Sequence, residues 1–140
     1  MLALDHIGIA VNDIDATLKT LALFGLTPGE RGVVSQFHVE VCMLSLGNTQ
    51  IELLRPTSSD SPVAKFLARR GEGLHHIALR VSDIRQMLAE LKAHGVQLID
   101  EAPRVGFGGH FVAFIHPHST HGVLIELVQA SHTQHQGGPL

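Results

Sequence analysis

Cysteine is nearly absent from this chain. Cys42 is the only one among 140 residues, so an intramolecular disulfide is impossible. A zinc site built from several thiolates is excluded for the same reason. Any metal ion bound by this chain must therefore be held by nitrogen and oxygen ligands.

Several other features are missing as well. There is no Trp and no Tyr, and six Phe supply all the aromatic side chains, which argues against an aromatic-lined binding groove. No apolar run approaches the roughly 18 residues that a membrane span requires, and the N-terminus has no basic leader region. Lys and Arg are dispersed and the formal net charge is −3, which argues against nucleic acid as a partner. We predict a soluble cytoplasmic protein with neither a membrane nor a nucleic-acid partner.

What the chain does contain is an internal repeat. His6–Ile14 (HIGIAVNDI) recurs as His76–Ile84 (HIALRVSDI), and Ile51-Glu52-Leu53 recurs as Ile125-Glu126-Leu127. Each copy therefore opens on a histidine and closes on a glutamate. A duplication of this kind predicts one metal site with ligands from both copies: His6, Glu52, His76 and Glu126.

Both copies begin with the same two structural signals. Apolar residues alternate with others in 5–11 and again in 75–81, which is typical of a strand with two unlike faces. His6 shares its face with Gly8 and Ala10, whose small size is expected to leave open space around the imidazole. Asp13 or Asp83 then precedes a helical pattern that stops near Gly25 or Gly95, so each helix is expected to cover the Ile/Val face of its sheet.

The remaining elements are predicted from alternation and turn residues. Residues 27–32 are turn-rich, 37–46 and 49–54 form a hairpin, and 63–69 is a short helix within a linker; in the second copy, 96–99, 111–115 and 123–128 are strands and 104–110 is a loop. The predicted order is βαβββ twice, an α+β fold with a mixed sheet. We expect one domain over 1–130, with modules 1–56 and 73–130, a linker at 57–72 and a disordered tail at 131–140.

The four candidate ligands suit one kind of metal. Two neutral imidazoles and two carboxylates balance the charge of a divalent ion and leave two of six octahedral positions for water or substrate. Such an open site is typical of catalysis. The ligand set is compatible with Co²⁺, Mn²⁺, Ni²⁺, Fe²⁺ or Zn²⁺ and does not choose among them.

At this point the sequence resembles the vicinal oxygen chelate (glyoxalase/bleomycin resistance/dioxygenase) superfamily and, within it, the methylmalonyl-CoA epimerases. The superfamily resemblance rests on the paired layout with His6, Glu52, His76 and Glu126. The epimerase resemblance is carried by longer strings: LGNTQIELL (46–54), DSPVAKFL (60–67), GEGLHHIA (71–78), FIHP (114–117) and GVLIEL (122–127). The first module departs more, since its helix lacks the family's Phe-Tyr pair.

The resemblance implies a fold and a reaction. The fold would be the glyoxalase-like cupped mixed sheet, and the reaction would interconvert (2R)- and (2S)-methylmalonyl-CoA through a metal-stabilised enolate. The metal ligands would be His6, Glu52, His76 and Glu126, some relatives having glutamine at the position of Glu52. Co²⁺ would be the first candidate, with Mn²⁺, Ni²⁺ or Zn²⁺ as alternatives, and the enzyme would be a homodimer acting on an acyl-CoA substrate.

Inverting the configuration at C2 of methylmalonyl-CoA requires that a proton be removed from this carbon and then returned to it. We predict that two carboxylates carry out these transfers. Glu126 is the first candidate. Glu40 is the second, because it resembles a carboxylate proposed as a base in some epimerases; the competing interpretation is an exposed strand glutamate. Competing functions are a glyoxalase I-like lactoylglutathione lyase, an extradiol dioxygenase, and a metal-free small-molecule binding protein of the same superfamily.

Overall fold

The computed structural model describes residues 2–130. The described chain forms two compact units: the first is His6–His76, and the second combines residues 2–5 with residues 77–130. The boundaries between them fall inside two strands. The predicted tail at 131–140 lies outside the described residues, and the predicted single domain stays a prediction.

Each half of the described chain has the predicted element order. The elements are β1 (Ala3–Ala10), α1 (Ile14–Ala22), β2 (Pro28–Val34), β3 (Val39–Leu46), β4 (Thr49–Pro56), α2 (Pro62–Arg70), β5 (Gly73–Arg80), α3 (Ile84–Ala93), β6 (Arg104–Val105), β7 (Phe111–Ile115) and β8 (Ile125–Gln129), with short 3₁₀ turns at Ser35–Phe37, Phe107–Gly109 and Pro117–Thr120. The βαβββ order therefore occurs twice, with α2 between the copies. The longest described helix, α3, has 10 residues, and no helix in residues 2–130 is long and apolar enough to cross a membrane.

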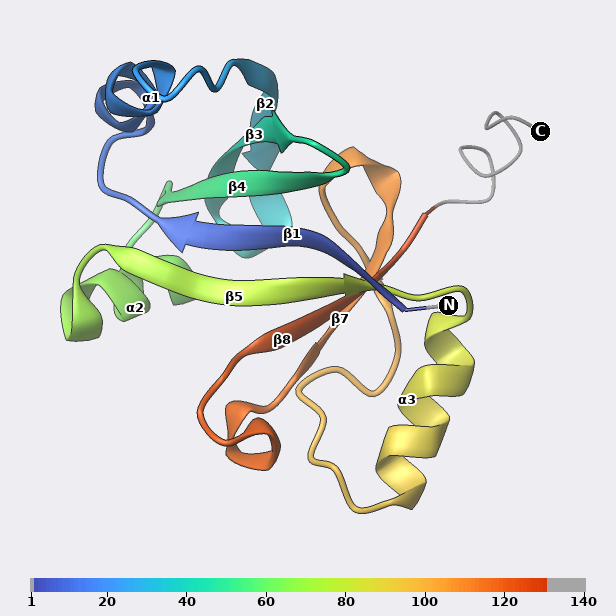
Figure 1. The fold of residues 1–140 in the computed structure, drawn as a ribbon. Helices are drawn as coiled ribbons and strands as arrows, with labels where there is room; N and C mark the ends of the chain where they lie inside the picture. The colour runs from blue at the N-terminus through green and yellow to red at the C-terminus, as the bar shows by residue number, and fades with distance from the viewer. Residues whose placement is uncertain (1, 131–140) are drawn as a thin grey trace. The chain divides into compact units, whose positions relative to one another are not determined.

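In the first unit the sheet order is β2-β3-β4-β1 (Figure 1). β1 and β4 are parallel, whereas β3 is antiparallel to both β2 and β4. Gly8 of β1 is the register partner of Glu52 in β4, and Met43 of β3 is the other partner of Glu52. Because register partners project to the same side of a sheet, His6, Gly8, Met43 and Glu52 lie on one face.

Helix α1 covers the opposite face of this sheet, as the alternation predicts. The Asp13 carboxylate accepts a hydrogen bond from the Ala16 N–H at 3.0 Å and so caps the helix, and Gly25 follows its end with φ of 89°. The core beneath the helix consists of buried apolar residues: Val11, Ile14, Cys42, Leu44, Ile51 and Leu53. The buried apolar area on this side stabilises the sheet and leaves its other face for polar groups.

The second unit repeats the arrangement, with sheet order β5-β8-β7-β6 and a parallel β5–β8 pair. Asp83 caps α3 by accepting from the Gln86 N–H at 3.1 Å, and the core lies between α3 and the sheet. Glu126 of β8 is the register partner of Ala78 in β5 and of Phe114 in β7. The repeated topology explains why the sequence motifs recur at equivalent structural positions.

Two local predictions were wrong. All but the first residue of the turn-rich stretch 27–32 belongs to β2, an edge strand on β3 with a register shift between Pro28 and Arg31. An edge strand with an irregular register accommodates the proline and glycines that suggested a turn. The proline and glycines that predicted a turn therefore mark an irregular edge strand.

The second error concerns the second predicted strand of the second copy, at residues 96–99. Of residues 96–99, only Leu98 forms a bridge, to Ile115, and β6 lies instead at Arg104–Val105. The Asp100 carboxylate accepts a hydrogen bond from the Phe114 N–H at 2.9 Å. A side chain thus satisfies a backbone donor that a continuous ladder would have used, and the strand forms further along the chain.

The core of the first unit yields a stability prediction. Leu53 has no exposed surface, so Leu53→Ala should lower the free energy of unfolding by about 2–5 kcal/mol through lost burial and a residual cavity. Leu23, at the end of α1, is 86% exposed, so Leu23→Ala should change the free energy of unfolding by less than about 0.5 kcal/mol. Urea denaturation of both variants measures the difference, and equal losses would contradict this assignment of the core.

Candidate metal centre

Three of the four predicted ligands meet in the first unit. The His6 Nε2 lies 3.1 Å from the His76 Nε2, and the Glu52 Oε1 lies 3.3 Å from the first and 3.4 Å from the second. All three residues are buried, with exposed fractions of 5%, 8% and 5% for His6, Glu52 and His76. Two nitrogens and one oxygen therefore form a small triangle that is largely shielded from solvent.

Local sequence explains how these side chains converge. Strand alternation directs His6 and Glu52 to the face opposite α1, and His76 reaches the same place from β5. A Cβ added at Gly8 would overlap the His76 ring, approaching Cε1, Nδ1 and Nε2 more closely than van der Waals contact allows. The open space predicted over Gly8 is therefore occupied by the second imidazole, and only glycine permits that approach.

The Glu52 carboxyl is ionised in this setting. Burial by itself would raise its pKa, but hydrogen bonds from the His6 and His76 side chains outweigh burial and hold the pKa well below its usual value. A buried carboxylate next to two imidazole nitrogens is the kind of negative, nitrogen- and oxygen-rich environment that a cation fills.

The spacing of the donor atoms fits a single divalent ion. Metal–ligand distances of about 2.1 Å place neighbouring ligand atoms of an octahedral ion about 3.0 Å apart, and those of a tetrahedral ion about 3.4 Å apart. The three observed separations, 3.1, 3.3 and 3.4 Å, span this range. The same donor atoms could therefore bind one ion with little rearrangement.

The fourth predicted ligand, Glu126, belongs to the second unit. It lies in β8 with an exposed fraction of 7%, between its register partners Ala78 and Phe114. Few ionisable residues are buried to this extent without a functional or structural partner. Its role as a ligand and as a proton-transferring group stays a prediction.

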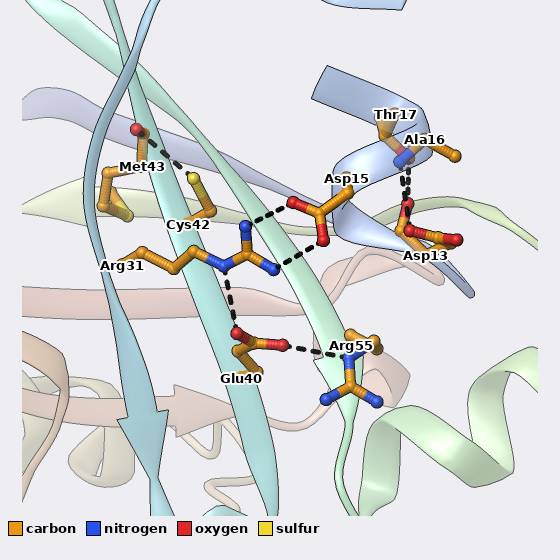
Figure 2. A network of polar contacts seen from close by, with 9 residues as sticks. All are labelled: Asp13, Asp15, Ala16, Thr17, Arg31, Glu40, Cys42, Met43 and Arg55. Carbon is orange, nitrogen blue, oxygen red and sulfur yellow. Dashed lines mark hydrogen bonds and ion pairs between the residues drawn. The ribbon is translucent and has the colours of Figure 1, made fainter. Parts of the chain in front are cut away.

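Glu40, the second predicted base, occupies a different environment. Its register partner is Arg55, and the neighbouring pair Cys42–Leu53 belongs to the core beneath α1, so Glu40 projects to the face opposite Glu52. One of its oxygens accepts from the Arg31 Nε and the other from the Arg55 Nε, each at 3.0 Å. Figure 2 shows the two arginines on either side of the carboxylate. The same Arg31 guanidinium binds Asp15 of α1 at 2.7 Å.

The interpretation of Glu40 as a base is therefore not supported. Alternation along the strand was read correctly, but it places Glu40 with Cys42 on the helix-covered face rather than on the face of Glu52. Its carboxylate joins β3 to β2 and β4 through two arginines, and Arg31 extends this network to α1. These contacts assign Glu40 a structural role.

His75 is not one of the predicted metal ligands, but its side chain contacts one of them. Its Nδ1 lies 2.9 Å from the Nδ1 of His76, and its ring packs edge-on against Phe66 of α2 at a centroid distance of 4.9 Å. In the sequence, only the adjacency of the two histidines could have suggested that His75 contacts His76, since alternation predicts opposite faces for neighbouring residues.

Comparison with known proteins agrees with the fold and the site. Residues 5–114 match the model of the Glyoxalase/Bleomycin resistance protein/Dioxygenase superfamily, and the chain belongs to that superfamily. The predicted α+β class and glyoxalase-like fold are thereby confirmed.

Several relatives resemble the chain over most of its length. It is 42% identical to the uncharacterized protein YqjC of Bacillus subtilis, over 94% of this chain and 95% of that protein. It is 36% identical to the mitochondrial methylmalonyl-CoA epimerase of Bos taurus, over 91% of this chain and 74% of the bovine protein. A methylmalonyl-CoA epimerase of Streptomyces coelicolor, solved as a variant in complex with 2-nitronate-propionyl-CoA, superposes with a TM-score of 0.89 at 38% identity, covering 93% of this chain and 95% of that one. These similarities place the chain close to the epimerases of its superfamily.

The close approach at Gly8 leads to a prediction about metal binding. Gly8→Ala should displace the His76 ring and weaken divalent-metal affinity by more than about 100-fold, because one ligand leaves the triangle. Gly29→Ala is the matched control, since a Cβ added at this strand glycine would meet only the Met43 carbonyl group, with its oxygen at 3.3 Å. Titration against a chromophoric chelator measures both affinities; unchanged affinity in Gly8→Ala would show that His76 is not a ligand.

The Glu40 network yields a prediction about pH. Hydrogen bonds from Arg31 and Arg55 hold the pKa of the Glu40 carboxyl below its usual value of 4.5, so the charged form stabilises the folded state. Glu40→Gln should therefore lower the free energy of unfolding by about 1 kcal/mol at pH 7, a figure reduced by the partial exposure of both arginines.

The stability difference between Glu40→Gln and the wild type should be complete above about pH 4.5 and should shrink as the pH falls through the folded-state pKa. Urea denaturation across pH measures it. Metal affinity should not change, because Glu40 lies on the other face of the sheet; a large loss of affinity would contradict this placement.

Proposed function

We propose that this protein is a metal-dependent epimerase that interconverts (2R)- and (2S)-methylmalonyl-CoA. The observation that carries the proposal is the buried triangle of His6 Nε2, His76 Nε2 and Glu52 Oε1, with separations of 3.1–3.4 Å. Its context supports this substrate, because the chain is 36% identical to the bovine methylmalonyl-CoA epimerase and 38% identical to the one from Streptomyces coelicolor.

His6, Glu52 and His76 would hold the ion, with Glu126 as the fourth ligand. Two observations support including Glu126. First, Glu126 is the repeat counterpart of Glu52. Second, Ala78 is the register partner of Glu126, and Ala78 projects to the same side of β5 as His76, which precedes it by two residues. Two neutral imidazoles and two carboxylates then balance a divalent charge. We propose Co²⁺ first, with Mn²⁺, Ni²⁺ and Zn²⁺ as alternatives.

The reaction requires acidification of one carbon. The C2 hydrogen of methylmalonyl-CoA lies between a carboxylate and a thioester carbonyl, and removing it shifts negative charge onto their oxygens. A bound divalent ion supplies Lewis-acid stabilisation of that charge. Glu126 is then the proposed acid–base residue at C2. For inversion, its carboxylate must take the proton from one face of C2 and its protonated form must return a proton to the other face, each within hydrogen-bond range of the carbon's proton.

β3 contributes an apolar wall on the ligand-bearing face. Val39, Val41 and Met43 share the side of Glu52 and are buried, with exposed fractions of 5%, 2% and 8%. Ser45 follows them, so β3 carries no ionisable side chain on this face. With Glu40 on the other side, Glu126 is the one predicted acid–base residue that remains. An apolar wall also lowers the local dielectric and strengthens the charge interactions that the reaction uses.

The proposed assembly is a homodimer that acts on an acyl-CoA in the cytoplasm. The homodimer and the acyl-CoA substrate rest on the family resemblance, whereas the cytoplasmic location rests on the composition of the chain. The oligomeric state is independent of the ligand geometry, so size-exclusion chromatography with light scattering can test it separately.

A proton-exchange assay tests the reaction and the metal together. Methylmalonyl-CoA in deuterated water should lose its C2 proton signal in the presence of the enzyme and Co²⁺, and a chelator should abolish the exchange. Glu126→Gln should slow exchange by about 10²- to 10⁴-fold, because the proton-transferring group is lost. The matched carboxylate-to-amide control, Glu40→Gln, should retain the wild-type rate. Proton nuclear magnetic resonance measures the exchange.

The outcomes separate the alternatives. Metal binding without exchange would argue for another proton transfer in the superfamily, such as that of a lactoylglutathione lyase, and a glutathione hemithioacetal would then be the substrate to test. Absence of metal binding would favour a small-molecule binding protein. Loss of exchange in Glu40→Gln but not in Glu126→Gln would reverse the roles assigned to these residues.

A further inference from the structure

We propose that His75 is a positioning residue that fixes the orientation and tautomer of the His76 imidazole, so that Nε2 of His76 presents a lone pair to the metal. This inference rests on the metal site proposed above, and it concerns metal affinity rather than the reaction. It assigns a role to the first histidine of the His75-His76 pair.

The two nitrogens of the His76 ring have different partners. Nε2 faces the His6 Nε2 at 3.1 Å and the Glu52 Oε1 at 3.4 Å, whereas Nδ1 lies 2.9 Å from the His75 Nδ1. A neutral imidazole carries only one N–H. A nitrogen that binds a metal cannot carry that hydrogen, so the His76 hydrogen must reside on Nδ1 when Nε2 is a ligand.

The tautomer of His75 follows from that of His76. If the His76 Nδ1–H donates, the His75 Nδ1 must accept, and the hydrogen of a neutral His75 lies on its Nε2. Ligating histidines commonly donate their second N–H to an acceptor that sets the ring orientation and increases the basicity of the ligand nitrogen. Here the acceptor is the adjacent residue of the same strand.

His75 is itself held in place by the helix between the two repeats. The Phe66 ring of α2 meets the His75 ring at an interplanar angle of 72°, and Phe66 is 9% exposed. The Ser61 side chain, which is fully buried, caps α2 by accepting from the Val63 N–H at 3.1 Å. The linker predicted at 57–72 therefore also supports the ligand, through Phe66 and then His75.

The His76 ring is thus constrained from two directions. The β1 backbone at Gly8 allows the ring to approach from one direction, and the hydrogen bond to His75 fixes the rotation that directs Nε2 at His6 and Glu52. Without the second constraint the imidazole can rotate about its side-chain torsions. Each misoriented state reduces the fraction of molecules ready to bind metal and lowers the affinity accordingly.

Replacement of His75 tests the inference through Co²⁺ affinity, measured by competition with a chromophoric chelator. His75→Leu should weaken binding by about 10- to 100-fold, the range seen when the hydrogen-bond partner of a ligand is lost. His75→Asn should remain within a few-fold of the wild type, because its amide oxygen can accept in place of Nδ1. His118→Leu, which removes an exposed histidine, is the matched control and should have no effect.

Thermal unfolding of the metal-free variants establishes that they fold. Wild-type affinity in His75→Leu, or an equal loss in His75→Leu and His75→Asn, would overturn the inference. A wild-type protein that binds Co²⁺ but shows no C2 exchange would refute the proposed reaction and leave the role of His75 standing.

A measurement on the unmodified chain avoids any folding defect. In the Zn²⁺-loaded protein, ¹⁵N nuclear magnetic resonance should show a protonated Nδ1 in His76 and, in His75, an unprotonated Nδ1 with a protonated Nε2. A hydrogen on the His75 Nδ1 would overturn the inference, because that nitrogen could not accept from His76.

Discussion

The buried Glu52 carboxylate is the constraint on which the candidate site depends. A charge with so little exposure is costly unless cationic or hydrogen-bonding groups surround it, and the two imidazole nitrogens within 3.4 Å meet that requirement. The register of β4 with β1 and β3 places this group on the face away from the core. The hydrophobic core and the polar centre are therefore consequences of the same alternation, one on each side of the sheet.

Two carboxylates of the same strand pair illustrate how side-chain direction decides a role. Glu52 and Glu40 both lie in the β3–β4 hairpin, and both have a pKa lowered by nearby hydrogen-bond donors. Glu52 meets two imidazole side chains, whose nitrogens can share a cation with its carboxylate. Glu40 meets two guanidinium groups that already neutralise it, and Arg31 ties it to α1 (Figure 2). A lowered pKa alone therefore does not mark a catalytic group.

In the first unit, the site combines residues of both repeat motifs, so neither motif alone predicts it. The His76 ring occupies the space above Gly8, so a residue of the second repeat motif depends on the absence of a side chain in the first. The helix between the repeats contributes as well, because Phe66 contacts His75 and His75 contacts His76. Connections in a protein of this size can thus support a site while joining its halves.

Much of the architecture could be predicted because it depends on short-range patterns. Alternation around His6 and His76, the caps Asp13 and Asp83, and the repeated Ile-Glu-Leu strings predicted the βαβββ order, the helix-covered faces and the candidate ligands. The edge strand β2 and the displaced β6 were missed, since their pairing depends on partners distant in sequence and on a side chain, Asp100, that replaces a ladder hydrogen bond.

The facing of Glu40 and the contact of His75 with His76 were decided by the tertiary structure. Alternation assigns residues to two faces but does not say which face is covered, and it treats adjacent side chains as pointing apart. Local sequence by itself determined which residue types stand at each strand position. Packing decided which of them meet, because a hydrogen bond or an ion pair needs atoms from separate elements within about 3 Å.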